Sequence, residues 1–237
     1  MGKTRDTILW ISGASGGIGG GLARNTPYPG ARIINLDIAA SDEWETILFD
    51  LTDPASWARV EESFRKETQA FPDARLRFMN CAYAPIAKGL VCAVDAQDYA
   101  RALIANMAGV LTLSASFVRT VGKGHDAGLM IMSSNAGEQP LPGYSTYGPA
   151  KAAVEHWVRI VRREMFARGW GPWITAVRPG LVDTPTARAA SKLDPAVFPL
   201  GANMDKRLDD VAVSIDDIAQ RIWQALSGDR PDALYDL

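Results

Sequence analysis

The segment Thr7–Gly19, TILWISGASGGIG, joins an apolar run to a glycine-rich turn. Its first six residues favour β-structure and predict a strand that is buried on both faces. Glycines at positions 13, 17 and 19 follow at once, in the spacing G-x-x-x-G-x-G. Glycine lets the backbone turn sharply and approach a pyrophosphate, and a helix N-terminus beyond the turn offers free N–H groups. The segment therefore predicts a phosphate-binding strand–turn–helix unit. A purely structural turn is the alternative.

Beyond this segment, short apolar runs alternate with longer segments of helical periodicity. Strands are expected over residues 7–12, 31–36, 46–49, 76–81, 129–133, 173–177 and 234–237. Helices are expected over residues 54–70, 98–121, 146–168 and 214–227. This alternation predicts an α/β fold with a doubly wound, Rossmann-like parallel sheet in three αβα layers. Residues 181–212 show no clear element, and so long a loop is typical of a functional lid or a disordered stretch.

The composition indicates an ordinary globular chain, with 47% hydrophobic and 22% charged residues among 237, which excludes a disordered or low-complexity polymer. No linker divides the chain, so one domain is expected over residues 1–237. A cofactor half would end near residue 130, a catalytic and substrate half would follow, and a lid would cover about residues 185–210. The net charge of −2 argues against nucleic acid or an anionic membrane as a partner.

Cysteine and histidine usage argues against a metal site. Cys81, Cys92 and the two histidines do not form a cluster with the spacing of zinc ligands. A disulfide framework is not expected either. The charge-free stretch 103–118 is too short and too polar to span a bilayer. The N-terminal residues 1–7 are polar and lead into no signal region, so a cytoplasmic protein is expected.

Four further positions carry chemistry. Asp37 ends the second expected strand, where an acid can hydrogen-bond the ribose of a dinucleotide. Tyr147 and Lys151 stand at i and i+4 and share one helix face. Ser134 closes the fifth expected strand. Each residue alone has an ordinary reading, as a solvated charge, a packing tyrosine or a polar strand end, but their joint order after the glycine turn is specific.

This set resembles the short-chain dehydrogenase/reductase family, in its single-domain branch of roughly 250 residues, over nearly the whole chain. The resemblance implies that Ser134, Tyr147, Lys151 and Asn106 form a catalytic tetrad. It also implies a set of cofactor-binding residues: Gly13, Ser15, Gly17, Ile18, Gly19, Asp37, Asp50, Leu51, Asn80, Ala82, Tyr147, Lys151, Pro179, Gly180, Val182 and Thr184.

The sequence departs from the family pattern at four places. Ser12 replaces a threonine but keeps a hydroxyl, while Cys81 and Tyr83 replace an asparagine and a glycine. Cys81 is expected to be a buried small residue and not a nucleophile. The family's common Asp-Gly-Gly finish is absent after the last strand, which makes a tetramer less secure than a dimer.

The implied chemistry is reduction of a carbonyl or oxidation of an alcohol. A nicotinamide exchanges the hydride, and Tyr147 exchanges the proton, with a phenol pKa lowered by Lys151 and the nicotinamide cation. Ser134 would orient the substrate oxygen, and Asn106 would hold a water that links Lys151 to solvent. The main alternative is a silent dinucleotide-binding sensor on the same fold. A cofactor-dependent epimerase or dehydratase is a third reading, for which the chain is short.

NAD is favoured over NADP because Asp37 would repel a 2′-phosphate, and Gly16 and Ile38 offer no positive charge. Arg24 and Arg32 remain alternatives that could reach the site. The candidate substrate wall is Tyr83, Leu141, Tyr144, Phe198, Leu200 and Met204, together with Ser134. Its apolar character favours a hydrophobic or aromatic small molecule. Arg188 and Lys192 could instead bind an anionic substrate.

Two expectations concern the whole molecule. The helices over 98–121 and 146–168 carry more apolar surface than one sheet face requires, with Trp157 and Ile160 as examples. By resemblance, they would pair with their copies across a two-fold axis and form at least a homodimer. Residues 186–207 are expected to be poorly ordered without ligand and to close over substrate.

Overall fold

The computed structural model describes residues 6–228 and 231–237. Within this part of the chain, a single parallel sheet has the strand order β3-β2-β1-β4-β5-β6-β7. The strands are β1 (Thr7–Ser12), β2 (Arg32–Asp37), β3 (Glu45–Leu48), β4 (Arg75–Asn80), β5 (Asp126–Met132), β6 (Trp173–Arg178) and β7 (Leu234–Asp236). Every expected strand is present within a few residues of its expected ends. The predicted doubly wound α/β fold is therefore confirmed. Of the N-terminal residues 1–7 on which the signal-region argument rests, 1–5 lie outside the described part.

Helices connect the strands. They are α1 (Gly17–Arg24), α2 (Pro54–Ala70), α3 (Ala96–Leu103), α4 (Val110–Thr120), α5 (Tyr147–Arg168), α6 (Pro185–Ser191), α7 (Met204–Val211) and α8 (Ile215–Ala225). Short turns of other helix types are η1 (Ile104–Gly109, a π-helix), η2 (Asn135–Gly137) and η3 (Pro199–Gly201). Side-chain caps start two of these helices: Asp53 accepts the N–H of Ala55 at the start of α2, and Ser214 caps α8.

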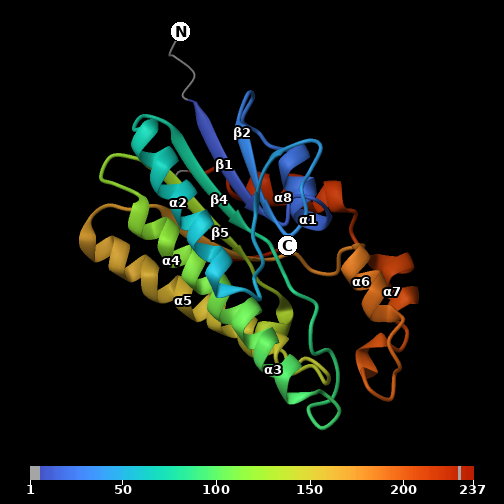
Figure 1. Cartoon of the computed structure of the whole chain (residues 1–237). Helices are drawn as coiled ribbons and strands as arrows, with labels where there is room; N and C mark the ends of the chain where they lie inside the picture. The colour runs from blue at the N-terminus through green and yellow to red at the C-terminus, as the bar shows by residue number, and fades with distance from the viewer. Residues whose placement is uncertain (1–5, 229–230) are drawn as a thin grey trace.

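The helices form two layers around the sheet. In Figure 1, α2, α4 and α5 lie together on one side of the sheet, and α1 and α8 lie on the other. Alternate residues of β1 serve the two cores, so that Trp10 packs with α2 and α4, while Leu9 packs with α1 and α8. The Trp10 ring meets the ring of Phe64 edge-on, with 5.2 Å between centroids. Burial on both faces explains the continuous apolar run in this strand.

The segment 181–212 corrects the prediction that it lacks regular structure. It contains α6, η3 and α7, which Figure 1 shows in orange and red beside the main body. Thr184 caps α6 with Pro185 at the first helical position. Phe198, Met204 and Leu208 form a small core of this segment's own. Two-turn helices carry too few apolar residues to show a helical period, which is why the sequence pattern missed them.

The helical run Ala96–Thr120 passes a length-and-composition test for a membrane span, because α3, η1 and α4 are continuous. It is longer than the charge-free stretch noted in the sequence. More than half of its most apolar window, 56%, is buried inside the molecule. Leu113 and Phe117 are fully buried among the core residues between α2, α4 and the sheet. The apolar side chains of this run thus serve as packing surface against the sheet.

Candidate active site

The predicted site residues gather at the carboxyl ends of the parallel strands. After β1, the chain continues to β2 and β3 on one side of the sheet. After β4, it continues to β5, β6 and β7 on the other side. The strand order therefore reverses between the neighbouring strands β1 and β4. In open α/β sheets, a ligand cleft forms at such a switch point. Ser12, Asn80 and Arg178 close β1, β4 and β6, and Ser134 follows β5 by two residues. The topology therefore brings distant segments to one edge.

The glycine turn has the backbone that its sequence predicts. Gly13 and Gly17 have φ of +79° and +52°, in the left-handed region that favours glycine. A Cβ on Gly19 would lie 2.4 Å from the carbonyl oxygen of Gly13, so only glycine fits at this close approach. A Cβ on Gly16 or Gly17 would meet no atom within 4 Å, so this side of the turn faces open space.

The residues around the turn fit a dinucleotide. Gly16 makes no side-chain cap, so the first N–H groups of α1, including that of Ile18, have no side-chain acceptor from the N-cap. An uncapped helix N-terminus beside open space is suited to a pyrophosphate. The Ser15 side chain accepts a hydrogen bond from Asn35, and the Ser15 N–H donates to Asp37 at 3.3 Å. This contact joins the turn to the end of β2.

Asp37 lies where the sequence predicts a ribose-binding acid. Its carboxylate also accepts the N–H of Ile38 at 2.7 Å, which holds it at the strand end. The two arginines that were alternatives for a basic partner are paired elsewhere. Arg24 pairs with Asp216 of α8, and Arg32, at the opposite end of β2, pairs with Glu45 and Glu67.

A buried hydrogen-bond chain links β1 to β4. The Ser12 hydroxyl donates to Asn80 and accepts the N–H groups of Cys81 and Ala82, each at 2.9 Å. The substitution of serine for the family threonine therefore keeps its hydroxyl in use. Ala82 contacts the turn at Gly13. Burial raises the pKa of the Cys81 thiol to about 12 against the opposing effect of nearby Lys151. The thiol stays protonated, as expected for a structural cysteine.

The predicted cofactor-binding residues Asp50 and Leu51 lie next to the end of β2. The N–H of Phe49 donates to the carbonyl of Asp37 at 2.9 Å. Asp50 follows, and its carboxylate accepts the N–H of Thr52 at 2.7 Å. Leu51 is buried against the α2 and α4 layer. Asp50 thus flanks the expected nucleotide cleft, while the Leu51 side chain belongs to the core.

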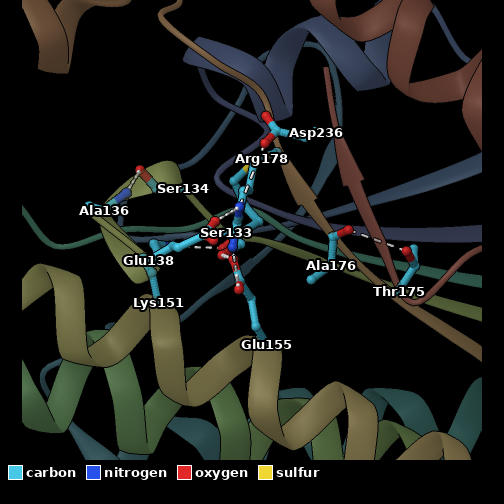
Figure 2. Close-up of polar contacts among 11 residues, drawn as sticks. Ser133, Ser134, Ala136, Glu138, Lys151, Glu155, Thr175, Ala176, Arg178 and Asp236 are labelled. Carbon is cyan, nitrogen blue, oxygen red and sulfur yellow. Dashed lines mark hydrogen bonds and ion pairs between the residues drawn. The ribbon is translucent and has the colours of Figure 1, made fainter. Parts of the chain in front are cut away.

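Ser134, Tyr147 and Lys151 come together beneath the turn. Tyr147 is the first residue of α5 and hydrogen-bonds Ser134. Lys151, one turn later, lies with its ammonium 5.5 Å from the centroid of the Tyr147 ring. Its Nζ donates to the carbonyl of Met132 at 2.7 Å. Figure 2 shows Lys151 reaching from α5 toward the end of β5.

The electrostatics of this pair differ from the expectation. Burial raises the pKa of Tyr147, and the hydrogen bond with Ser134 opposes that rise only in part. Burial lowers the pKa of Lys151 to about 8. The phenol pKa is therefore not lowered by Lys151 alone, because burial is the larger effect and the ammonium donates to a backbone carbonyl.

Asn106 lies in the π-helix η1, whose local widening is frequent at functional sites. Its side chain donates to the carbonyl of Ala84 at 2.8 Å and accepts the N–H of Ala84 at 2.9 Å. Both ends of the amide are engaged with one residue of the loop after β4. Asn106 therefore fastens this loop to the helix, and the relay water stays a prediction.

The segment after β6 borders the same edge. Pro179 and Gly180 follow the strand, with Gly180 at φ +70°. Val182 is buried and pairs with Val213. The Thr184 hydroxyl accepts the N–H of Ala187 at 3.1 Å. In this structure the Thr184 side chain thus caps α6, the first helix of the 181–212 segment.

A buried ionic cluster lies beside the predicted catalytic residues, and the sequence pattern did not indicate it. Arg178 binds both carboxylate oxygens of Glu155, with N–O distances of 2.7 and 2.8 Å, and binds Glu138 at 2.6 Å. The Ser133 hydroxyl donates to Glu155 at 2.7 Å. Figure 2 shows the cluster between α5 and the ends of β5 and β6, with Asp236 above it.

Glu155 in this cluster stays ionised although it is buried. Burial acts to raise the pKa of Glu155, but hydrogen bonds from Arg178 and Ser133 outweigh it and hold that pKa below its usual range. Glu155 stands one helical turn beyond Lys151 on α5. A pattern of three residues at i, i+4 and i+8 could have pointed to it, since Tyr147, Lys151 and Glu155 share one helix face.

The predicted substrate wall divides into two groups. The rings of Tyr83 and Tyr144 contact the ring of Tyr147, with centroid distances of 5.1 and 4.8 Å. Phe198 is fully buried against Tyr144 at 5.1 Å. Phe198 and Met204 belong to the core of the 181–212 segment, with Leu200 packed against it. In this structure they pack within that segment and reach the site through Tyr144, and their contact with a substrate stays a prediction.

Two cavities lie outside the catalytic group. One of about 630 Å³ runs along the loop after Ser134 and is lined by Leu141, Tyr144 and Leu90. A larger one of about 1090 Å³ lies at the opposite end of the sheet, beside the end of α5, His125 and Trp170. Neither of these two cavities is lined by Ser134, Tyr147 or Lys151.

Comparison with known proteins places this arrangement in a family. A family model described as enoyl-(acyl carrier protein) reductase matches residues 13–227. The chain is 26% identical over 183 residues to 2,3-dihydro-2,3-dihydroxybenzoate dehydrogenase of Escherichia coli, covering 76% of this chain and 71% of that protein. It is also 26% identical over 194 residues to the 3-oxoacyl-[acyl-carrier-protein] reductase FabG of the same organism, covering 78% and 77%.

Solved structures share the fold. A short-chain dehydrogenase from Burkholderia cenocepacia in complex with NADP superimposes with a TM-score of 0.75 and 21% identity, covering 99% of this chain and 97% of that one. A short-chain dehydrogenase/reductase from Burkholderia phymatum in complex with NAD gives 0.76 and 20%, covering 99% and 90%.

Proposed function

Because this chain belongs to the short-chain dehydrogenase/reductase family and is an NAD(P)-dependent oxidoreductase, we propose that it interconverts a ketone or aldehyde and an alcohol with Tyr147 as the acid/base. The observation that carries the proposal is the contact of Ser134, Tyr147 and Lys151 at the carboxyl edge of the sheet. A silent sensor on the same fold has no chemical need for a buried tyrosine and lysine at this place.

A bound nicotinamide supplies or takes the hydride. In the reductive direction, the Tyr147 hydroxyl gives its proton to the substrate oxygen, and the raised pKa of Tyr147 keeps that hydroxyl protonated at neutral pH. Ser134 hydrogen-bonds the same oxygen and orients it. In the oxidative direction, Lys151 stabilises the phenolate, and its own pKa of about 8 lets it pass on a proton near neutral pH.

NAD is the proposed preference. The Asp37 carboxylate, held by the N–H groups of Ser15 and Ile38, would accept hydrogen bonds from a ribose 2′-hydroxyl and repel a 2′-phosphate. Ile38 is 73% exposed and brings no charge, and Arg24 and Arg32 are engaged with acids elsewhere. The solved relatives carry NAD in one case and NADP in another, so the support comes from Asp37.

The aromatic contacts of Tyr147 support an apolar or aromatic substrate. Tyr83 and Tyr144 flank the phenol, and an aryl group would stack between such rings with favourable edge-to-face geometry. The reacting oxygen would then meet Ser134 and Tyr147.

Tyr147→Phe tests the proposal in an assay of aryl ketones with NADH and NADPH, read at the nicotinamide absorbance. We expect kcat to fall by about 10²-fold or more, while nucleotide binding, measured by calorimetry, changes little. Tyr235→Phe, a tyrosine of β7, is the matched control. Wild-type turnover in Tyr147→Phe would refute the role of Tyr147, and a higher kcat/KM with NADPH would refute the NAD preference.

A further inference from the structure

Among the described residues, one lysine near the proposed acid/base Tyr147 has no counter-ion. Lys88 lies on the loop after β4, and its ammonium stands 5.8 Å from the centroid of the Tyr83 ring. Lys88 is half-buried, and within the described residues no acid forms an ion pair with it. Burial is the sole cause that lowers the pKa of Lys88. A partly desolvated cation without a partner is unfavourable, and proteins usually pair such charges.

The position of Lys88 is held by the surrounding backbone. Ala87, just before it, has φ +57°, a conformation that a non-glycine residue adopts only under constraint. Gly89, just after it, donates its N–H to the carbonyl of Gly143 at 3.0 Å and pairs with Tyr144. The next N–H, of Leu90, donates to the carbonyl of Val197 at 2.8 Å. The loop is thus tied both to the segment before Tyr147 and to the 181–212 segment.

Lys88 therefore stands across one aromatic ring from the proposed acid/base. Its ammonium contacts the ring of Tyr83, and that ring contacts the ring of Tyr147 at 5.1 Å. Tyr83 stands where the family usually has glycine, so this ring is a feature of this chain. Burial also raises the pKa of Tyr83 and keeps its hydroxyl protonated as a donor.

Arg188 and Lys192, the two residues that the sequence offered for an anionic substrate, are less suited than Lys88 to bind an anion. Arg188 is paired with Asp183 and Asp209, each at 2.8 Å. Lys192 is exposed to solvent, where its charge gains little from an additional ion pair. Lys88 alone among these three is both partly desolvated and without a described acidic partner.

We propose that Lys88 binds a carboxylate of the substrate, so that the enzyme acts on keto or hydroxy acids with an apolar or aromatic framework. This rests on the proposed function, because the carbonyl or alcohol of the same molecule must reach Tyr147. A single ammonium among aromatic rings matches a singly charged carboxylate, and it matches a doubly charged phosphate poorly. The aromatic framework would lie against Tyr83 and Tyr144, between the two polar ends.

The test compares reduction of 4-acetylbenzoate with that of the neutral, similarly shaped 4-acetylbenzamide. The wild type should prefer the acid in kcat/KM, and Lys88→Met should lower kcat/KM for the acid by about 10- to 100-fold, as for a lost charge-assisted hydrogen bond. The amide should change less than about threefold. Lys88→Arg should keep most of the preference, and Lys123→Met, an exposed lysine before β5, should change neither substrate.

Three outcomes would overturn the proposal: no preference for the acid in the wild type, equal losses on both substrates in Lys88→Met, or loss of the preference in Lys192→Met instead. Failure of the proposed function would look different, since the wild type would then reduce neither compound. In that case, calorimetric binding of 4-acetylbenzoate to the nucleotide-loaded protein decides. Weaker binding to Lys88→Met than to Lys123→Met supports the carboxylate site, and equal binding refutes it.

Discussion

At Lys151, an ammonium group is held where only 4% of the residue is exposed. Its hydrogen bond to the carbonyl of Met132 replaces one of the water contacts that it loses. Burial nevertheless lowers the pKa of Lys151 from an ordinary 10.5 to about 8. A charge so placed opposes folding while it stays protonated, which is typical of a group retained for chemistry.

The stability of the protein should therefore depend on pH through Lys151. The folded pKa lies below the unfolded one, so between about pH 8 and 10.5 the unfolded chain binds more protons and stability rises with pH. Between pH 7 and 9.5, the unfolding free energy of the wild type should rise by about 2 kcal/mol more than that of Lys151→Met. Urea denaturation at several pH values measures this difference.

The control for this prediction is Lys66→Met, which removes an exposed lysine of α2. Its unfolding free energy should run parallel to that of the wild type across the same pH range. Parallel curves for Lys151→Met as well would show that Lys151 titrates normally in the folded protein.

Among the elements, α5 is tied to the sheet by polar contacts as well as by its apolar face. Arg178 at the end of β6 forms an ion pair with Glu155 of α5. Glu155 also accepts a hydrogen bond from the hydroxyl of Ser133, the neighbour of Ser134. Farther along α5, Arg162 donates to the carbonyls of Ile174 and Pro231. These bonds fix the register of α5 against β5 and β6, and hence the placement of Tyr147 and Lys151 relative to Ser134.

Removing the charge of Glu155 should loosen this register. Glu155→Gln leaves Arg178 buried with only the exposed acids Glu138 and Asp236, so we expect a loss of about 3 kcal/mol in unfolding free energy at pH 7. Turnover should fall as well, because the ends of β5 and β6 carry site residues. Glu164→Gln, an exposed glutamate of α5, should change stability by less than about 0.5 kcal/mol.

The pH dependence separates the ion pair from simple packing. The folded pKa of Glu155 is depressed, so its stabilisation is present above an unfolded pKa of 4.5 and is lost as the pH falls through the folded value. The difference in unfolding free energy between the wild type and Glu155→Gln should therefore become smaller below pH 4.5. A gap that stays constant down to pH 3 would contradict the charge-based account.

The molecule as a whole leaves apolar surface uncovered on α5. Val154, Val158 and Val161 are buried, which accounts for part of the apolar excess noted in the sequence. Ile160 is 44% exposed and Phe166 is 84% exposed. Phe166 is the more exposed of the two, and the family resemblance pairs this helix with its copy across a two-fold axis. We propose that this surface pairs with a second copy in a homodimer.

Sedimentation velocity at micromolar concentration tests the dimer. We expect a species of twice the chain mass for the wild type, and Phe166→Asp should shift it to monomer because a buried carboxylate would be desolvated in the interface. Phe71→Asp, at the end of α2 and 42% exposed, is the matched control and should remain dimeric. A wild-type monomer refutes the proposal.

Local sequence patterns were sufficient to predict much of this structure. The glycine turn and the strands could be predicted because each depends on neighbouring residues: positive φ at Gly13 needs glycine, and a central parallel strand needs a continuous apolar run. The order of Ser134, Tyr147 and Lys151 along the chain pointed to one site because strand ends and helix starts converge at one edge of such a sheet.

Long-range contacts required the tertiary structure. Glu155 and Arg178 look like ordinary surface charges in the sequence, since most charged residues are solvated, and only folding buries them together. Lys88 shows no partner pattern in the sequence. Its loop is held by contacts of Gly89 with Tyr144 and of Leu90 with Val197, which come from two distant segments.

The sequence determined the backbone plan and the kinds of reactive group, because those depend on residue type and short spacing. The tertiary structure decided how each group is ionised and which groups meet, because desolvation and charge pairing depend on distance in space. Lys151 is the clearest case: its identity was visible in the chain, but its lowered pKa exists only because the folded protein excludes water from it.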